Sequence, residues 1–296
     1  MTRRRLVLVA VLAVAAIAVA LWQLTAETAP LRIERVRVGD TPATVFAPPD
    51  GGPAPAVAIA HGFAGSQQLM QPFAITLARN GYLAVTFDFR GHGRNPRPLT
   101  GDVTKVSGAT QVLIDELAKV ADYARGRPDS DGRLALVGHS MASDIVVRTA
   151  QRVGTDAAAT VAVSMFAPTL APASPRNLLT IVGALVPSVL KQEARRAVAM
   201  APDAPAPAQV ERGRTYGAFA DGTARRLVLA DRVEHIAVLY SPDSMAAARD
   251  WLNAAFDRTG AGFEAVRGPW IALLLAGIVA LAPPLAPLLP RGTAGP

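Results

Sequence analysis

Residues 134–142 read LALVGHSMA, and this stretch decides how the rest of the chain is interpreted. Its apolar beginning predicts a strand, and the helical spacing of residues 143–153 predicts a helix directly after it. A strand, a tight turn with a serine at its apex and a helix form the context of a nucleophile elbow, in which a strained serine exposes its hydroxyl. The positions two before and two after this serine must be small, as Gly138 and Ala142 are. The alternative is an ordinary turn with an incidental serine.

Apolar runs and helical segments alternate on both sides of this turn. Short apolar runs without polar alternation are typical of strands buried in a parallel sheet, and intervening helices of about a dozen residues predict cover on both faces. Residues 33–46 precede them and read as a hairpin. We therefore predict an α/β fold with a mainly parallel central sheet. The predicted strands are 56–60, 83–87, 134–137, 160–166, 178–182 and 226–229, and the predicted helices are 68–79, 112–123, 143–153, 189–200 and 242–256.

Chemically useful residues follow several of the predicted strands. The motif HGF stands at 61–63, DFRGHG at 88–93, and Ser140 ends the strand of the elbow. Ligands of parallel sheets bind beyond the carboxyl ends of the strands. We therefore expect these motifs to lie on one rim of the sheet.

The order of these motifs resembles the α/β-hydrolase family. The likeness rests on HGF at 61–63, DFRGHG at 88–93, GHSM at 138–141 and a late histidine, and it extends from about residue 33 to 256. The resemblance implies the α/β-hydrolase fold and a serine hydrolase, with an acyl-enzyme formed on Ser140. The expected reaction is cleavage of a carboxylic ester, with lipid-like esters and thioesters as candidate substrates. Nucleophilic serine instead of aspartate argues against epoxide hydrolysis.

The catalytic base is sought among the four histidines of the chain. In the family's arrangement His61 belongs to the oxyanion turn, His92 to a structural turn, and His139 is the neighbour of the nucleophile, with its side chain directed away. His235 remains, and it lies downstream of Ser140 where the family's base falls. The alternative is a histidine satisfied in the core or at an interface.

The resemblance also implies an oxyanion hole made of two backbone amides, those of Phe63 and Met141. Backbone donors constrain conformation more than residue type, so the identity of these side chains is not informative.

The acid that should orient the base is missing from its expected place. The family puts Asp or Glu in the loop after the strand 178–182, but this loop reads GALVP and has Val186 at that position. Glu193, Asp203 and Asp221 are possible substitutes. A wrong imidazole tautomer costs a serine protease about 10⁴ in turnover. The sequence therefore leaves three alternatives: a slow enzyme, a dyad enzyme, or a degenerate hydrolase that serves as a binding or assembly module.

Two apolar stretches dominate the composition. The 296 residues are 51% hydrophobic, and the mean hydropathy is +0.27. Residues 6–24, preceded by three arginines, and residues 270–289 account for the excess, and each is close to the ~20 residues of a membrane-spanning helix. We predict an N-terminal membrane anchor at 1–26, an α/β-hydrolase domain at 30–260, a C-terminal transmembrane segment at 268–290 and a tail at 291–296.

The arginines at positions 3–5 should remain in the cytoplasm, which puts the hydrolase domain on the outer side of a bacterial-type inner membrane. A cleaved signal is the alternative for the first stretch, but its apolar run exceeds the ~7–15 residues of a signal core. A buried helix is the alternative for the second. Four prolines between 283 and 290 predict an irregular last third of that segment.

The remaining composition argues against other classes of function. The net charge is +7, but the arginines are scattered without interleaved aromatic residues, so nucleic acid is not an expected partner. The chain has no cysteine, and its sequence predicts no metal site and no cofactor. The expected partners are a small ester or lipid-like substrate and the lipid bilayer.

Overall fold

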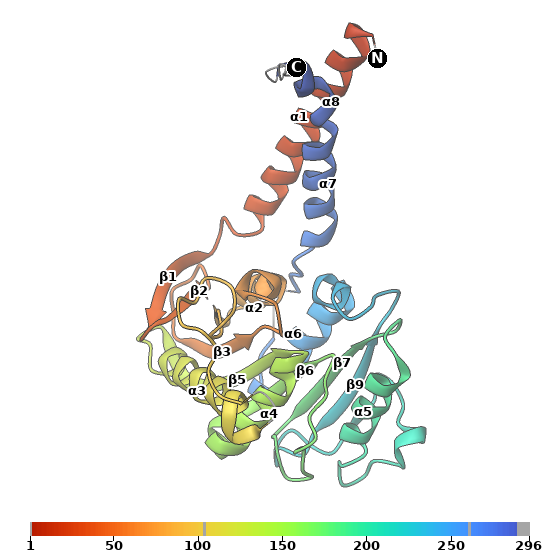
Figure 1. Ribbon diagram of the computed structural model, residues 1–296. Helices are drawn as coiled ribbons and strands as arrows, with labels where there is room; N and C mark the ends of the chain where they lie inside the picture. Colours follow the sequence, from red (N-terminus) through yellow and green to blue (C-terminus); the bar gives the residue numbers. More distant parts are fainter. Residues whose placement is uncertain (1, 103–104, 260–261, 289–296) are drawn as a thin grey trace. The chain divides into compact units, whose positions relative to one another are not determined.

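The computed structural model describes residues 2–102, 105–259 and 262–288 (Figure 1). The chain divides into two compact units: unit 1 comprises Met1–Ala29 and Val266–Pro296, and unit 2 comprises Pro30–Ala265. The predicted tail at 291–296 and the last two positions of the predicted segment 268–290 lie outside the described residues.

A mainly parallel sheet forms the centre of unit 2, as predicted (Figure 1). In the described residues it has nine strands in the order β1-β2-β4-β3-β5-β6-β7-β9-β8. The β1–β2, β2–β4 and β8–β9 pairs are antiparallel, and the other neighbours are parallel. The strands are β1 (Arg32–Val38), β2 (Thr41–Ala47), β3 (Ala54–Ala60), β4 (Leu83–Phe87), β5 (Ser130–His139), β6 (Ala157–Val163), β7 (Leu178–Gly183), β8 (Thr215–Tyr216) and β9 (Arg225–Ala230).

Helices cover both faces of this sheet, because successive strand residues point to opposite sides. In β3, Val57 and Ile59 pack in a core with α2 and α6, whereas Ala56, Ala58 and Ala60 pack in a core with α3 and α4. Every residue of β3 is buried. The helices are α2 (Gln71–Arg79), α3 (Gln111–Arg125), α4 (Met141–Val153), α5 (Ser188–Val198) and α6 (Pro242–Phe256), with short helices η1 (Gln67–Met70), η2 (Val106–Thr110), η3 (Gly154–Asp156), η4 (Pro207–Gln209) and η5 (Ala237–Tyr240).

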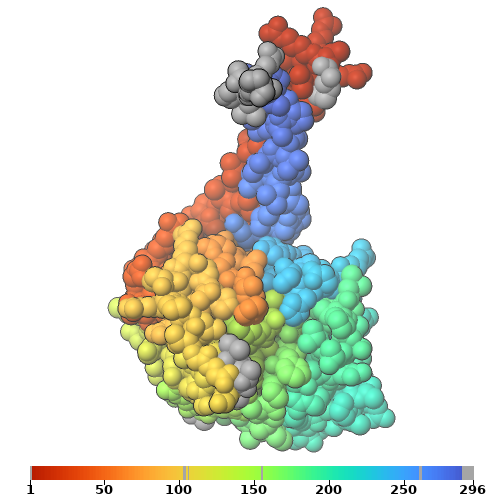
Figure 2. All heavy atoms as spheres, viewed as in Figure 1, coloured from red at the N-terminus to blue at the C-terminus, as the bar shows by residue number. Residues whose placement is uncertain are grey.

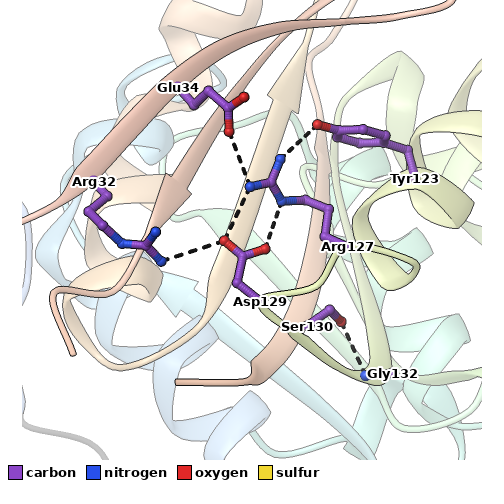
Figure 3. Close-up of polar contacts among 7 residues, drawn as sticks. All are labelled: Arg32, Glu34, Tyr123, Arg127, Asp129, Ser130 and Gly132. Atoms are coloured by element: carbon purple, nitrogen blue, oxygen red, sulfur yellow. Dashed lines mark hydrogen bonds and ion pairs between the residues drawn. The ribbon is translucent and has the colours of Figure 1, made fainter. Parts of the chain in front are cut away.

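Arg127 fixes the start of β5, the strand that carries the elbow (Figure 3). Its guanidinium donates to Asp129 at 2.8 Å, to the hydroxyl of Tyr123 at 2.7 Å and to Glu34 of β1 at 3.1 Å. Hydrogen bonding to Arg127 also holds the pKa of the Asp129 carboxyl below its usual range. The contacts tie the entry of β5 to α3 and to the edge strand β1.

Unit 1 is a pair of helices that pack side by side (Figures 1 and 2). They are α1 (Arg3–Ala26) and α7 (Arg267–Ala280). Small residues allow the close approach: Ala13, Ala20 and Gly277 are buried, and a Cβ on Gly277 would lie 2.8 Å from Cγ1 of Ile17. Among the described residues, Arg3–Ala26 and Arg267–Leu288 are long and apolar enough to cross a membrane, although the first also fits a signal sequence.

The proline-rich end of unit 1 is more regular than predicted. Two short helices, α8 (Ala282–Leu285) and η6 (Ala286–Leu288), follow α7 after Leu281. Pro283 and Pro284 lie in the first turn of α8, where their missing N–H groups need no partner in the helix. The prolines therefore break this segment into short helices but do not end its helical structure before Leu288.

Candidate active site

Ser140 stands at the junction of β5 and α4 in a strained conformation. Its φ of 54° and ψ of −117° lie outside the regions that non-glycine residues favour, and such strain costs of the order of 1–3 kcal/mol. Two hydrogen bonds hold it: its N–H donates to the carbonyl of Val163 at 2.9 Å, and the Ser143 hydroxyl donates to its carbonyl at 2.6 Å. The predicted elbow geometry is thus present in the structure.

Ser140 and His235, the nucleophile and the base of our prediction, lie in direct contact. The distance from Ser140 Oγ to His235 Nε2 is 2.9 Å. His235 lies between β9 and η5, 95 positions after the serine. When the hydroxyl donates in this contact, Nε2 is the acceptor and the proton of the neutral ring is on Nδ1.

None of the three suggested acids contacts His235 in the described part of the chain. Glu193 pairs with Arg196 at 2.6 Å, and the Asp203 and Asp221 carboxylates accept backbone N–H groups between positions 217 and 223. No described carboxylate bonds to Nδ1 of His235. The pair is therefore a serine–histidine dyad among the described residues.

The segment after β7 packs closely against the backbone that precedes His235. A Cβ on Gly183 would lie 2.5 Å from the carbonyl oxygen of Val233 and 2.8 Å from that of Glu234. The N–H of Leu185 donates to the same Val233 carbonyl at 3.0 Å. Val186 is 4% exposed and packs in the core beside α5. The backbone before His235 thus occupies the space beside β7, and Val186 faces the core.

The turn that carries Phe63 lies against the nucleophile. A Cβ on Gly62 would be 3.0 Å from Cβ of Ser140, so only glycine allows this approach. The Phe63 side chain is 74% exposed and meets the ring of His92 edge to face, with centroids 5.6 Å apart. Met141 is the first residue of α4. The two expected oxyanion donors therefore belong to two segments that adjoin Ser140.

His61 and His139 are buried and neutral. His61 Nδ1–H donates to the carbonyl of Gly62 at 2.8 Å, while its Nε2 accepts the N–H of Phe89 at 3.1 Å. His139 Nε2–H donates to the carbonyl of His235 at 2.9 Å. Burial lowers the pKa of each imidazole to about 4.

These two histidines should make the protein less stable in mild acid. Their pKa in the unfolded chain is near 6.5. On acidification the unfolded state therefore binds protons that the folded state does not bind until the pH approaches 4. Their stabilising contribution is complete above pH 6.5 and is lost between about pH 6.5 and 4. We expect the free energy of unfolding to fall by about 2 kcal/mol per histidine from pH 7 to pH 5. Urea unfolding of the full chain in detergent checks this, and a stability that rises over this interval would contradict it.

Asp88 maintains the DFRGHG turn and does not reach the dyad. Its carboxylate accepts the backbone N–H and the side-chain amide of Gln67 at 2.8 and 2.9 Å, and the N–H of Arg94 at 3.0 Å. The contacts link this turn to the start of η1.

A cavity of about 420 Å³ opens at the dyad. Its lining is mainly apolar, with Asp144 as the charged exception; that carboxylate accepts from Arg148 at 2.7 Å, and burial raises its pKa. Such a cavity suits an apolar acyl or alcohol group. The apolar lining includes Phe63, Leu99, Leu113, Ile145, Phe166 and Leu190.

The loop between β6 and β7 forms one wall of this cavity and is held by Arg225. This arginine is 1% exposed, and burial lowers its pKa to about 10. It donates to the carbonyls of Ala171, Pro172 and Ala197 at 2.6, 2.9 and 2.7 Å. Between the end of β6 and the start of β7 this loop carries no helix.

Ser143 is a contributor that the sequence analysis did not identify. Besides donating to the Ser140 carbonyl, its hydroxyl accepts the N–H of Phe166 at 3.0 Å. It thereby joins the elbow to the cavity wall. Its place one helical turn after the nucleophile is the signal that could have indicated this role.

Comparison with protein families gives one match over more than half of the chain. The family described as Hydrolase_4, serine aminopeptidase S33, matches residues 51–212. Two curated proteins of Mycobacterium tuberculosis, both called uncharacterized, are 31% identical over 99 residues, which is 33% of this chain and 32% of each relative. The aligned part therefore spans about a third of the curated relatives.

Solved structures share the fold. A predicted CIB-like hydrolase from Thermoplasma acidophilum has a TM-score of 0.54 at 16% identity, covering 75% of this chain and 97% of that one. A dienelactone hydrolase from Anabaena variabilis has a TM-score of 0.54 at 18% identity, covering 77% and 96%. At these identities the likeness establishes the architecture.

Proposed function

Because the chain belongs to the serine aminopeptidase S33 family of α/β hydrolases, we propose that it is a serine hydrolase that cleaves carboxylic esters. The observation that carries this proposal is the 2.9 Å contact between Ser140 Oγ and His235 Nε2 in the lining of a mainly apolar cavity. A hydroxyl in contact with an imidazole acceptor is the minimum arrangement for nucleophilic catalysis by serine.

The mechanism begins when Ser140 Oγ attacks the ester carbonyl and its proton passes to Nε2 of His235. The negative charge on the carbonyl oxygen is stabilised by the backbone N–H groups of Phe63 and Met141, each worth about 2.7–4 kcal/mol in comparable sites. Collapse of the intermediate breaks the bond to the alcohol, which takes the proton from the imidazolium. Water then attacks the acyl-enzyme with His235 as base, and the acid product leaves.

We propose an ester or thioester in preference to a peptide. An amine is a poorer leaving group than an alcohol or a thiol, so peptide cleavage depends more on a well-oriented imidazolium as general acid. No described carboxylate bonds to the imidazole of His235. The apolar cavity further favours a lipid-like acyl chain.

We also propose that the helices of unit 1 anchor the enzyme in a membrane, with unit 2 on the outer side. Support comes from the length and apolarity of Arg3–Ala26 and Arg267–Leu288 and from the three arginines at the first helix's start. Such arginines stay on the cytoplasmic side.

Labelling with a fluorophosphonate probe tests the proposed chemistry. The probe phosphonylates activated serines, so we expect it to modify the full chain in detergent and mass spectrometry to locate the adduct at Ser140. Protein unfolded in urea is the control and should stay unlabelled, because the activation depends on the folded contact with His235. An unlabelled folded chain, or an adduct at another serine, would argue against the proposal.

A second candidate is a degenerate hydrolase that acts as a binding or assembly module. The lack of a carboxylate on His235 in the described residues favours it. Such a module should tolerate replacement of both Ser140 and His235 in its biological assay, whereas an enzyme should not.

A further inference from the structure

The imidazole of His139 lies between two loops of the site. Its Nε2 is 2.9 Å from the backbone carbonyl oxygen of His235, and the centroids of the two rings are 5.0 Å apart. On its other side, a Cβ on Gly62 would lie 2.9 Å from its Nδ1. One side chain therefore touches both the loop of the base and the turn that bears the Phe63 amide.

The hydrogen bonding of this ring is not explained by stability alone. A carbonyl oxygen can only accept, so Nε2 carries the proton and Nδ1 is bare. That Nδ1 is buried without a hydrogen-bond partner among the described residues. A buried polar atom without a partner costs about 1–3 kcal/mol, which an apolar side chain of similar size would avoid. The Nε2–H bond to His235 is the feature that only a donor at this position can supply.

The base needs such a bond because, among the described residues, no carboxylate orients the imidazole of His235. In a triad a carboxylate on Nδ1 orients the imidazole, and no described carboxylate takes that place here. The neighbouring backbone is held instead: the Val233 carbonyl accepts from Leu185, and the Glu234 carboxylate accepts the N–H groups of residues 236 and 237 at 2.8 and 2.7 Å. The carbonyl of His235 itself is held by His139.

We propose that His139 is a positioning residue that replaces the missing acid: by binding the His235 carbonyl, it keeps the base's Nε2 in reach of Ser140 Oγ. The inference rests on the proposed function. In this role the residue before the nucleophile orients the base by holding the base's backbone carbonyl, and not its imidazole. The dyad then depends on one neutral hydrogen bond instead of an ion pair.

Two substitutions separate the hydrogen bond from the volume of the ring. His139→Leu removes the donor and roughly keeps the volume, whereas His139→Gln keeps an N–H near the position of Nε2. We expect the kcat of the His139→Leu variant on p-nitrophenyl acetate to fall about 10- to 100-fold with KM within about twofold, since a misplacement of 1 Å can cost about 10² in rate. The glutamine variant should recover most of the loss. Leucine-variant activity within about twofold of wild type, or equal loss in both variants, overturns the proposal.

A second readout does not require turnover. The chain has four histidines, so the ring nitrogens of a ¹⁵N-histidine-labelled full chain can be assigned with a His235→Gln variant. We expect one sharp tautomer for His235 in wild type and in His139→Gln, and exchange-broadened or mixed tautomers in His139→Leu. An unchanged His235 signal in the leucine variant overturns the proposal. Wild type that is neither labelled nor active refutes the proposed function, and the His235 signal then decides the positioning role by itself.

Discussion

Ser140→Ala is expected to lower the turnover of p-nitrophenyl acetate by at least about 10²-fold and to end fluorophosphonate labelling. Removal of the nucleophile from a serine protease with a complete triad costs about 2 × 10⁶ in kcat. Loss of the acid's orienting role already costs about 10⁴ in such an enzyme. No described carboxylate reaches His235, so we assume that this protein already lacks the factor of about 10⁴ that the acid contributes. Dividing the total of about 2 × 10⁶ by this factor leaves about 10² as the loss of kcat expected from removing Ser140.

The effect of this substitution should fall on kcat and on kcat/KM equally, because the covalent bond forms only after substrate has bound. Ser188→Ala is the matched control, since Ser188 is exposed at the start of α5 and does not line the cavity. Its turnover should equal that of wild type. If Ser140→Ala keeps more than a tenth of wild-type turnover, the acyl-enzyme mechanism is wrong.

Gly138→Ala is expected to lower the free energy of unfolding of unit 2 by more than about 4 kcal/mol. Single substitutions reach this size only when they cause severe overpacking or a similar defect. The added methyl would collide with the carbonyl oxygen of Ala142 and lie 2.7 Å from Cγ1 of Val146. The carbonyl belongs to the first turn of α4, so relief requires α4 to move away from β5. A domain of ordinary stability has only about 5–15 kcal/mol in total, so the variant should lose a large share of its stability and unfold at a much lower urea concentration.

Urea unfolding followed by circular dichroism measures this change. Gly52→Ala is the control, because a Cβ there meets nothing within 4 Å and its φ is not in the left-handed region. That variant should stay within about 0.5 kcal/mol of wild type. Equal midpoints for the two variants would mean that the elbow is less tightly packed than the structure indicates.

Local signals made much of the fold predictable. The bounds predicted for β4 and α6 agree with the structure, because a continuous apolar run and a helical spacing define these two elements locally. β8 was not predicted: it comprises only Thr215 and Tyr216 and exists through its pairing with β9. Such an edge strand has no hydrophobic pattern of its own. The helical continuation after Leu281 was missed because prolines were interpreted as breakers and not as first-turn residues.

The candidate site was likewise predictable from the sequence only in part. Ser140 could be placed from its own turn, and His235 from its order in the chain, and the structure brings them together. Whether an acid completes them depends on how the backbone at 233–234 packs against Gly183. That contact joins segments that are far apart in the chain, and neither segment has a sequence pattern that would indicate it. The role of His139 toward the carbonyl of His235 is tertiary for the same reason.

The three carbonyls bound by Arg225 have a consequence for how substrate enters. The buried guanidinium ties Ala171 and Pro172 of the loop to Ala197 of α5 and so restricts the motion of the loop, whereas loop motions limit turnover in many enzymes. On this side of the cavity, binding of a substrate should therefore require no movement of the loop. For the proposed hydrolysis we therefore expect a kcat that does not fall when the viscosity of the solvent is raised.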